Sequence, residues 1–274
     1  MDTLKIGFIG GGNMARSIIG GLIADGRNPN TIWVSDASQD QLDHLKQIFN
    51  INVTTNNDAV AKATDVVVMA VKPQIMKIVA EEISCTVQDE QPLIMSIAAG
   101  IMENSLNKWL GGNVAIVRTM PNTPSLVQTG ATALYANTLV SNEQQNIAET
   151  IMRAVGLTLW IEEEKQMDAV TAVSGSGPAY FFLFMEAMEE AAIKLGLSDK
   201  AAQLLTLQTA FGAAKMALES QESCATLRQR VTSPGGTTEQ ALNTFEEGKL
   251  RILVEDALKA AANRSAELAQ QMGE

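Results

Sequence analysis

The chain has 274 residues, of which 46% are hydrophobic, 4% aromatic and 19% charged, a composition typical of a globular protein with one large or two medium domains. The net charge of −11 disfavours nucleic acid and anionic membranes as partners, because the field of the protein would repel both. Cys85 and Cys224 have no metal-type spacing, so we expect two unpaired thiols and no metal site.

Short β-branched runs alternate with amphipathic stretches up to about residue 161, which predicts an α/β fold with a doubly wound, mostly parallel sheet. We expect strands at residues 5–9, 31–35, 65–71, 93–97, 114–118, 131–135 and 157–161. The third of these runs is apolar without alternation from Val66 to Val71, as in a strand buried on both faces. It should therefore lie at the centre of the sheet.

Helical patterns replace strand patterns beyond about residue 162. Apolar residues from Phe181 to Leu195 recur at steps of three and four, and Gly196 would end that helix. Further helices are expected at residues 199–219 and from Gly248 to near the C-terminus. We therefore predict a Rossmann-type domain at residues 1–162 and an all-α domain at 163–274. Its stripes rich in alanine and glycine favour burial against a second copy of the chain, so at least a dimer is expected.

The N-terminal segment has neither the basic region nor the long apolar region of a secretion signal. No strongly apolar run approaches the roughly 20 residues that span a bilayer. We therefore expect a cytoplasmic protein with no membrane partner.

The first predicted strand runs into a glycine-rich turn, GGGNMA at residues 10–15, with the pattern GxGxxA. Followed by a helical stretch, this pattern is typical of a dinucleotide-binding βαβ unit. Gly10 would allow the tight turn, Gly12 would let a pyrophosphate approach the backbone, and Ala15 would allow close packing of helix and strand. The N–H groups and dipole of the helix start would hold the phosphates. The alternative is a glycine turn that binds no ligand.

The ends of later strands supply further candidates, because ligands of open α/β sheets bind outside the carboxyl ends of the strands. Asp36 follows the second strand, where an acidic residue commonly accepts a hydrogen bond from the adenosine ribose and would repel a 2′-phosphate. This favours NADH, although Asp36 could instead cap the following helix. Lys72 and the small residues 98–100 also follow strands, and Lys72 could equally be a solvated surface lysine.

Two glycine-rich segments lie in the helical half, SGSGPAY at residues 174–180 and TSPGGTT at residues 232–238. Both have the features of helix starts. Pro178 suits a first helical turn, while Thr237 and Gln240 have the spacing of a capping box.

The second of these segments has a functional interpretation and a structural one. Functionally, Gly235, Gly236 and Thr237 would offer backbone N–H groups to a substrate carboxylate, with Thr238 as the first helical residue. Structurally, the two segments would be capped helices with flexible entries.

The only histidine, His44, falls on the predicted helix after the second strand, away from any strand end, and is expected on the surface. Without a histidine base, a hydroxyacid dehydrogenase that removes an alcohol proton is disfavoured, although a lysine could serve. A substrate that needs little acid or base help, such as a protonated imine, fits better.

Six segments occur together in the order and spacing of one enzyme family: FIGGGNMA, AVKPQ, SIAAG, RTMPNTP, SGSGPAY and VTSPGGTT. That family is the pyrroline-5-carboxylate reductases, which the chain resembles over nearly its whole length. The resemblance implies hydride transfer from NADPH or NADH to C5 of 1-pyrroline-5-carboxylate, giving L-proline in the last step of proline biosynthesis. It also implies a substrate pocket built by the helical domain at a dimer interface, and dimers that can assemble into a pentamer of dimers. Two alternatives are a β-hydroxyacid dehydrogenase-like oxidoreductase and a non-catalytic dinucleotide-binding regulatory protein.

The resemblance also implies roles residue by residue. The cofactor-binding residues would be Ile9, Gly10, Gly11, Gly12, Asn13, Met14, Ser35, Asp36, Asn57, Ala70, Val71, Lys72, Pro73, Ile97, Ala98 and Ala99. The substrate-binding residues would be Ser233, Gly235, Gly236, Thr237 and Thr238. Thr238 would be the catalytic residue, with its hydroxyl hydrogen-bonded to the ring nitrogen, and residues 120–124 would shape the wall near the nicotinamide. Some members of the family carry a smaller or hydroxyl side chain in place of Asp36, so the implied preference for NADPH does not transfer directly.

Overall fold

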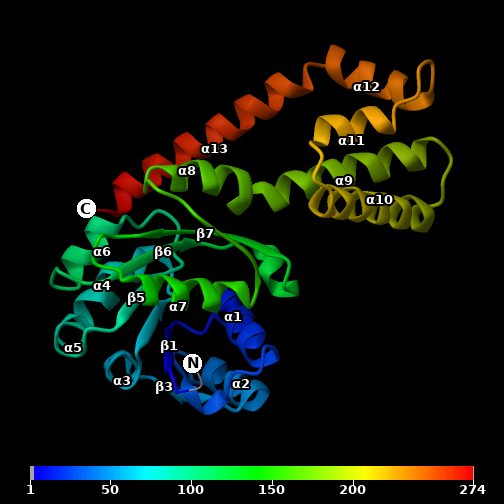
Figure 1. Cartoon of the computed structure of the whole chain (residues 1–274). Coiled ribbons are helices and arrows are strands. Elements are labelled where there is room, and N and C mark those ends of the chain that lie inside the picture. Colours follow the sequence, from blue (N-terminus) through cyan, green and yellow to red (C-terminus); the bar gives the residue numbers. More distant parts are fainter. Residues whose placement is uncertain (1–2, 274) are drawn as a thin grey trace. The chain divides into compact units, whose positions relative to one another are not determined.

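The computed structural model describes residues 3–273 and divides into two compact units (Figure 1). The first unit comprises the described residues up to Ser176 together with those from Ala260 onward. The second comprises Gly177–Lys259. The predicted boundary between the dinucleotide-binding domain and the helical domain, at residues 162 and 163, stays a prediction. The predicted fold class is confirmed, since a mostly parallel sheet is followed by helices alone in the described chain.

The first unit contains an eight-stranded sheet with the order β3-β2-β1-β4-β5-β6-β7-β8. Its strands are β1 (Ile6–Ile9), β2 (Ile32–Ser35), β3 (Asn52–Thr54), β4 (Val66–Met69), β5 (Leu93–Ser96), β6 (Ile116–Met120), β7 (Gly130–Ala136) and β8 (Gly156–Trp160). All neighbouring pairs are parallel except β6 and β7, which are antiparallel. The seven predicted strands are confirmed, and β3 is an eighth that the sequence reading missed.

Alternation along the strands distributes apolar side chains to both faces of the sheet. In β4, which lies between β1 and β5 as expected of a central strand, Val66 and Val68 belong to one core cluster while Val67 and Met69 belong to the other. The first cluster includes residues of α1 (Asn13–Ala24), α2 (Gln39–Phe49) and α7 (Asn142–Arg153). The second includes residues of α3 (Asn57–Ala63), α4 (Pro73–Glu82), α5 (Ser84–Glu90) and α6 (Glu103–Trp109). Helices therefore cover both faces, as a doubly wound sheet requires.

Short helical turns complete the first unit. They are the 3₁₀ turns η1 (Pro29–Thr31) and η2 (Thr123–Val127), the short helix α8 (Gln166–Val170) and the π-helical turn η3 (Thr171–Gly175). A hydrogen bond from the Ser176 N–H group to the Thr171 carbonyl, 2.8 Å long, closes the π turn. The first glycine-rich segment of the helical half therefore begins inside a π turn rather than in a loop.

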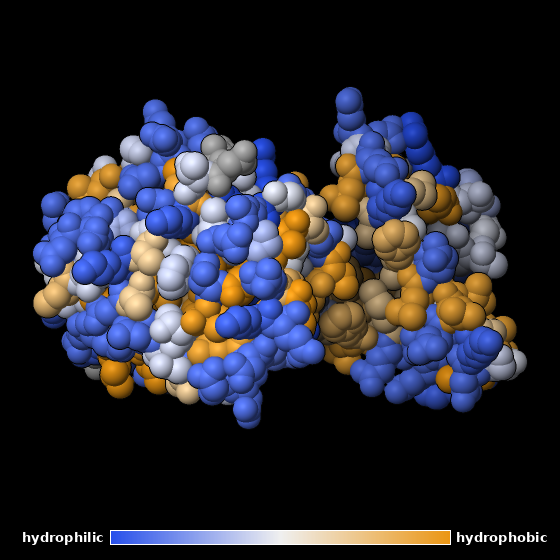
Figure 2. Space-filling view, turned by 90° about the horizontal axis from the view of Figure 1, so that it is seen from below, coloured by the Kyte–Doolittle hydropathy of each residue, from blue (hydrophilic) through white to orange (hydrophobic). Residues whose placement is uncertain are grey.

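The second unit is helical throughout, as predicted. It contains α9 (Gly177–Lys194), α10 (Asp199–Glu219), α11 (Cys224–Arg230), α12 (Thr237–Glu247) and the first part of α13 (Leu250–Met272). The bounds of α10 are those predicted, and Gly196 follows α9 with a φ of +103°, a conformation that favours glycine. Figure 2 shows hydrophobic side chains alongside hydrophilic ones on one face of this unit. No helix within residues 3–273 is long and apolar enough to cross a membrane.

Candidate active site

The glycine turn after β1 has the backbone geometry that dinucleotide binding needs. Gly10 has a φ of +100°, and a Cβ atom on it would lie 2.7 Å from the Ala70 carbonyl oxygen, so only glycine fits there. Gly12 begins α1 as its N-cap without a side-chain hydrogen bond, and open space lies where its Cβ atom would be. The N–H groups of the first turn of α1 are therefore presented to an anion rather than to a capping side chain.

Backbone hydrogen bonds bring the predicted cofactor segments together at the carboxyl ends of the parallel strands. The Gly10 N–H group donates to the Ser35 carbonyl, and the Ala70 N–H group donates to the Ile9 carbonyl, each over 2.8 Å. The Ile97 N–H group donates to the carbonyl at the end of β4 over 3.3 Å. One edge of the sheet therefore carries the ends of β1, β2, β4 and β5, where ligands of such folds bind.

Asp36 holds the glycine turn in place. One oxygen of its carboxylate accepts from the Gly11 N–H group over 2.8 Å, and the other accepts from the Ser38 N–H group over 2.9 Å. Ser38, not Asp36, is the N-cap of α2, because its hydroxyl accepts from the Gln41 N–H group. Gln41 also donates from Nε2 to the Gly11 carbonyl over 2.6 Å, a contact that the sequence reading missed.

Asn57 and Lys72 differ in how the structure places them. Asn57 begins α3, accepts from the buried Ser35 hydroxyl over 2.7 Å and donates to Glu82 over 3.0 Å. It therefore stands next to the end of β2. Lys72 is exposed and is the N-cap of α4, directly before Pro73, so its side chain is open to solvent at the same edge.

The segment after β6 runs across this edge toward α1. Thr119 Oγ1 donates to the Ser96 carbonyl of β5 over 3.2 Å. Further along, the Ser125 carbonyl in η2 accepts from the Ser17 hydroxyl of α1 over 2.6 Å. Residues 120–124 lie between these anchors, beside the helix whose start presents its N–H groups. Their predicted place near the nicotinamide stays a prediction.

The predicted substrate segment precedes α12 in the second unit. Gly236, not Thr237, is the N-cap of α12, and no side-chain cap is formed. The predicted capping box is therefore wrong: Thr237 is already helical, because the Gln240 N–H group bonds to the Gly236 carbonyl over 3.3 Å. The Glu239 carboxylate in the first turn instead accepts from the Gly235 N–H group over 2.7 Å. The sequence reading missed this carboxylate.

The segment before α12 still has backbone N–H groups that could bind a ligand. The Gly236 N–H group bonds to the Ser233 carbonyl over 3.0 Å, so this N–H group, like that of Gly235, is used within the segment. Thr237 and Thr238 occupy the first two helical positions, where backbone N–H groups have no partner within the helix. Thr237 is exposed and Thr238 half-buried. A carboxylate would therefore meet the helix start at these two residues.

A buried ion pair joins β6 to the segment after β8. Arg118 of β6 pairs with Glu164, and both side chains are largely buried. The Glu164 carboxylate also accepts from the Glu103 N–H group over 2.6 Å. Burial, followed by the Glu164 and Glu103 carboxylates, raises the pKa of Tyr135 against the opposing effect of Arg118. This cluster holds the segment after β8 against the sheet.

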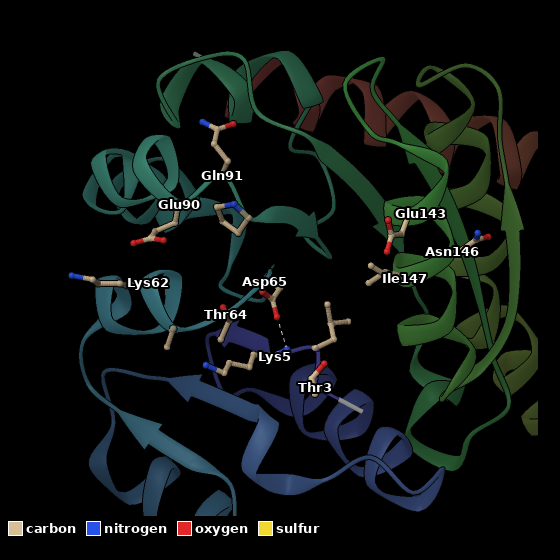
Figure 3. Close-up of a pocket in the computed structure, with 13 residues that line it drawn as sticks. Thr3, Lys5, Lys62, Thr64, Asp65, Glu90, Gln91, Glu143, Asn146 and Ile147 are labelled. Atoms are coloured by element: carbon tan, nitrogen blue, oxygen red, sulfur yellow. Dashed lines mark hydrogen bonds between the residues drawn. The ribbon is translucent and has the colours of Figure 1, made fainter. Parts of the chain in front are cut away.

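One cavity lies away from the cofactor edge (Figure 3). Its volume is about 820 Å³, and Lys5, Asp65 and Pro92, which line it, directly precede β1, β4 and β5. It therefore opens at the amino ends of the strands, where the Lys5 N–H group donates to Asp65 over 2.7 Å. Ligands of open α/β sheets bind at the opposite ends. We assign this cavity no part in dinucleotide binding.

The remaining predicted side chains lie where the sequence placed them. His44 is exposed on α2. Cys85 and Cys224 are exposed free thiols, as expected.

Two family models match the chain. Residues 5–100 match the family described as NADP oxidoreductase coenzyme F420-dependent, and residues 164–268 match pyrroline-5-carboxylate reductase dimerisation. The second match covers most of the helical part.

The parallel sheet and the uncapped glycine turn at the end of β1 define a dinucleotide-dependent oxidoreductase of the Rossmann type. A curated pyrroline-5-carboxylate reductase of Pseudomonas aeruginosa is 53% identical over 274 residues, covering 100% of both chains. The chain belongs to the pyrroline-5-carboxylate reductase family.

Solved structures agree with this assignment. A pyrroline-5-carboxylate reductase from Coxiella burnetii is 53% identical, with a TM-score of 0.94 over 97% of this chain and 98% of that chain. The Plasmodium falciparum pyrroline carboxylate reductase, solved with NADP bound, is 31% identical, with a TM-score of 0.86 over 98% of this chain and 99% of that chain.

Proposed function

We propose that the protein reduces 1-pyrroline-5-carboxylate to L-proline with hydride from NADPH or NADH, the last step of proline biosynthesis. The observation that carries this proposal is the 53% identity to a reductase of this name over the full length of both chains. Identity over the full length matters because a dinucleotide-binding fold alone is shared by enzymes with unrelated substrates.

The cofactor would bind along the edge formed by the ends of β1, β2, β4 and β5. Residues 9–14 would hold the pyrophosphate, and Ser35 and Asp36 would face the adenosine ribose. Asn57 with residues 70–73 and 97–99 would line the rest of the site. The open space at Gly12 and the uncapped start of α1 support this assignment. When bound, the dinucleotide supplies a hydride at C4 of its nicotinamide ring.

The substrate would bind at the segment before α12. The N–H groups of Thr237 and Thr238 would hold its carboxylate, while Ser233, Gly235 and Gly236 shape the turn through their own hydrogen bonds. The dipole of α12 would add a favourable field for the anion. This local positive potential matters because the chain carries a net charge of −11.

The protein's part in the chemistry is mostly orientation. The Thr238 hydroxyl would accept a hydrogen bond from the protonated ring nitrogen and so fix C5 toward the incoming hydride. The new C–H bond forms at C5 as the C=N electron pair moves to nitrogen, which gives the neutral secondary amine. Orientation can lower the barrier by several kcal/mol, and a hydrogen bond to a charged group contributes roughly 1.5–3 kcal/mol.

The test is the oxidation of NADH and, separately, of NADPH by purified protein with 1-pyrroline-5-carboxylate, followed at the nicotinamide absorbance. We expect oxidation that depends on the imine and yields L-proline. Oxidation that depends instead on a β-hydroxyacid's keto form would favour the alternative dehydrogenase. Cofactor binding without turnover on either substrate would favour a regulatory protein.

The Thr238→Ala variant tests the assigned catalytic residue. We expect kcat/KM to fall roughly tenfold to a hundredfold, because the lost hydrogen bond is to a charged nitrogen. Thr238→Ser keeps the hydroxyl and should stay within a few-fold of the wild type. Wild-type turnover by the alanine variant would remove Thr238 from the mechanism.

A cytoplasmic location and a pentamer of dimers are further parts of the proposal. The match of residues 164–268 to a dimerisation family supports the dimer. Light scattering on the native protein distinguishes two copies of the 29.3 kDa chain from ten.

A further inference from the structure

The side chain of Asn122 joins three segments of the first unit. Asn122 is buried, with 9% of its surface exposed, and lies two residues beyond the end of β6. Its Oδ1 atom accepts from the Ala131 N–H group over 2.9 Å, and its Nδ2 atom donates to the Ser174 carbonyl over 3.0 Å. Backbone pairing of β6 with β7 stops at Met120 opposite Ala133. Asn122 therefore continues the pairing where the backbone of β6 leaves the sheet.

The Ser174 carbonyl needs this donor for a reason visible in the sequence. In an α-helix, the carbonyl of residue 174 would accept from the N–H group of residue 178. That residue is Pro178, which has no N–H group. The backbone forms the π turn η3 here, and isolated π turns often mark functional positions. Asn122 supplies from a distant segment the donor that the helix lacks.

A second contact joins the same two segments. The backbone of Gly175, in the π turn, lies so close to β6 that a Cβ atom on it would be 2.6 Å from Cε of Met120. Ser174 itself is tied back into the turn, because its hydroxyl donates to the Val170 carbonyl over 3.0 Å. The π turn therefore packs directly on the first residue of the 120–124 segment.

The 120–124 segment is fixed at its two ends by Thr119 and Ser125, and in its middle by Asn122. Thr119 is anchored to β5, which leads into the predicted cofactor residues 97–99, and Ser125 is anchored to α1. The conformation of the segment between these anchors depends on the hydrogen bonds of the Asn122 side chain.

We propose that Asn122 is a positioning residue for hydride transfer: by holding the 120–124 segment against the π turn, it sets the surface on which the nicotinamide ring rests. This inference depends on the proposed function, because it assigns Asn122 a part in that reaction. Asn122 acts through the segment and does not touch the reacting atoms. Small displacements at such a surface have large effects, since misplacement by about 1 Å can lower a rate about a hundredfold.

The test compares Asn122→Ala with Asn137→Ala. Asn137 is a matched control because it closes the same pair of strands at the opposite end: its Oδ1 atom accepts from the Ile116 N–H group over 3.2 Å, and its Nδ2 atom donates to the Val114 carbonyl over 2.9 Å. Both variants lose partly buried hydrogen bonds and should unfold at lower temperature. Only Asn122 lies at the cofactor edge.

The decisive measurement is a single turnover of NADPH with saturating 1-pyrroline-5-carboxylate in a stopped-flow instrument. If a variant is only less stable, fewer molecules are folded, so the amplitude of the absorbance change falls. The rate constant of hydride transfer in the folded molecules stays the same. We expect Asn122→Ala to lower the rate constant at least tenfold and Asn137→Ala to change it less than twofold. An unchanged rate constant for Asn122→Ala, or an equal fall in both variants, would overturn the proposal.

Asn122→Asp is the second variant, and it replaces the alanine variant if that protein does not fold. It keeps the shape and the acceptor for Ala131 but cannot donate to Ser174, so the rate constant should again fall at least tenfold. A wild-type rate would overturn the proposal. Failure of the wild-type protein to reduce the imine would refute the proposed function itself, whereas an active wild type with unaffected variants refutes only the role of Asn122.

Discussion

Asp36 shows how one side chain can serve a structure and a ligand together. Its carboxylate accepts two backbone N–H groups, from Gly11 and Ser38, and so ties the glycine turn to the end of β2. A carboxylate can accept about four hydrogen bonds, so capacity remains for a ribose hydroxyl. Its negative charge nevertheless stays near the place where a 2′-phosphate would lie.

The Asp36→Asn variant tests this charge. The amide keeps one oxygen acceptor but loses the negative charge, so the ratio of kcat/KM for NADPH to that for NADH should rise roughly tenfold. Glu82→Gln is the control, because it removes a carboxylate that accepts a hydrogen bond from Asn57 in the same region. An unchanged ratio for Asp36→Asn would show that Asp36 does not discriminate between the cofactors.

Tyr135 gives a prediction in alkaline solution. Burial and the Glu164 and Glu103 carboxylates raise its pKa above the ordinary value of 10.0, although Arg118 opposes them. The neutral phenol is thus favoured in the folded state, so its contribution to stability is complete below about pH 10 and is lost as the pH rises through the folded pKa. The chain has two tyrosines, so in Tyr180→Phe the absorbance change near 295 nm reports Tyr135 alone. A midpoint at or below 10 would contradict the assignment.

At the scale of elements, two glycines at the junction of β1 and α1 have different roles, one in stability and one in dinucleotide binding. Gly10→Ala should destabilise the protein by several kcal/mol, because its φ of +100° is unfavourable for alanine and the Cβ atom would strike the Ala70 carbonyl. Gly12→Ala should change stability by less than about 1 kcal/mol, since open space surrounds it. It should instead weaken dinucleotide binding at least tenfold, since the methyl group would occupy the pyrophosphate's place. Chemical unfolding and titration calorimetry measure the two effects, and equal effects on both would contradict this division.

How far the sequence predicts these elements depends on where their partners lie in the chain. The glycine turn and β4 were predictable because each pattern is local: a GxGxxA after a strand and an unbroken apolar run. The short strand β3 was missed because its three residues are only half-buried and it lies at the edge of the sheet. The cap of α12 was misplaced by one residue because glycine and threonine both suit that position.

Contacts between distant residues could not be read from local patterns. Asn122 and its partner Ser174 are 52 residues apart in the sequence, and Arg118 and its partner Glu164 are 46 residues apart. Nothing in either local pattern indicates the other partner. Pro178 was the one signal available: because it has no N–H group, the carbonyl four residues earlier lacks its helical donor.

At the scale of the whole molecule, the helical unit exposes many large apolar side chains. In α9, Phe181 is 67% exposed and Leu183 is 66% exposed, and Leu205 and Phe211 of α10 are also exposed. Apolar patches of this kind mark interfaces. Together with the match of residues 164–268 to a dimerisation family, this surface supports a dimer formed through the helical unit.

The Phe181→Asp variant tests the interface. A charge at this position should favour monomers and lower activity, because a buried, unpaired carboxylate is costly in an interface. Ile78→Asp is the matched control: Ile78 is likewise 67% exposed, but it lies on α4 of the first unit. Analytical ultracentrifugation should show monomers only for the first variant. If both variants form dimers as stable as those of the wild type, the dimer interface does not include Phe181.

The return of α13 to the first unit has a consequence for how the protein is made. Residues from Ala260 onward belong to the same compact unit as the glycine turn: Ser265 donates to Asp168 over 2.7 Å, and Met272 packs against one of its two core clusters. A growing chain on the ribosome folds from its N-terminus at roughly 5–20 residues per second. The nucleotide-binding unit, although most of it is translated before the second unit, therefore lacks part of its own core until residues 260–273 have been synthesised. A product truncated after residue 259 would lack this part of the core, so quality control should recognise it by its incomplete first unit.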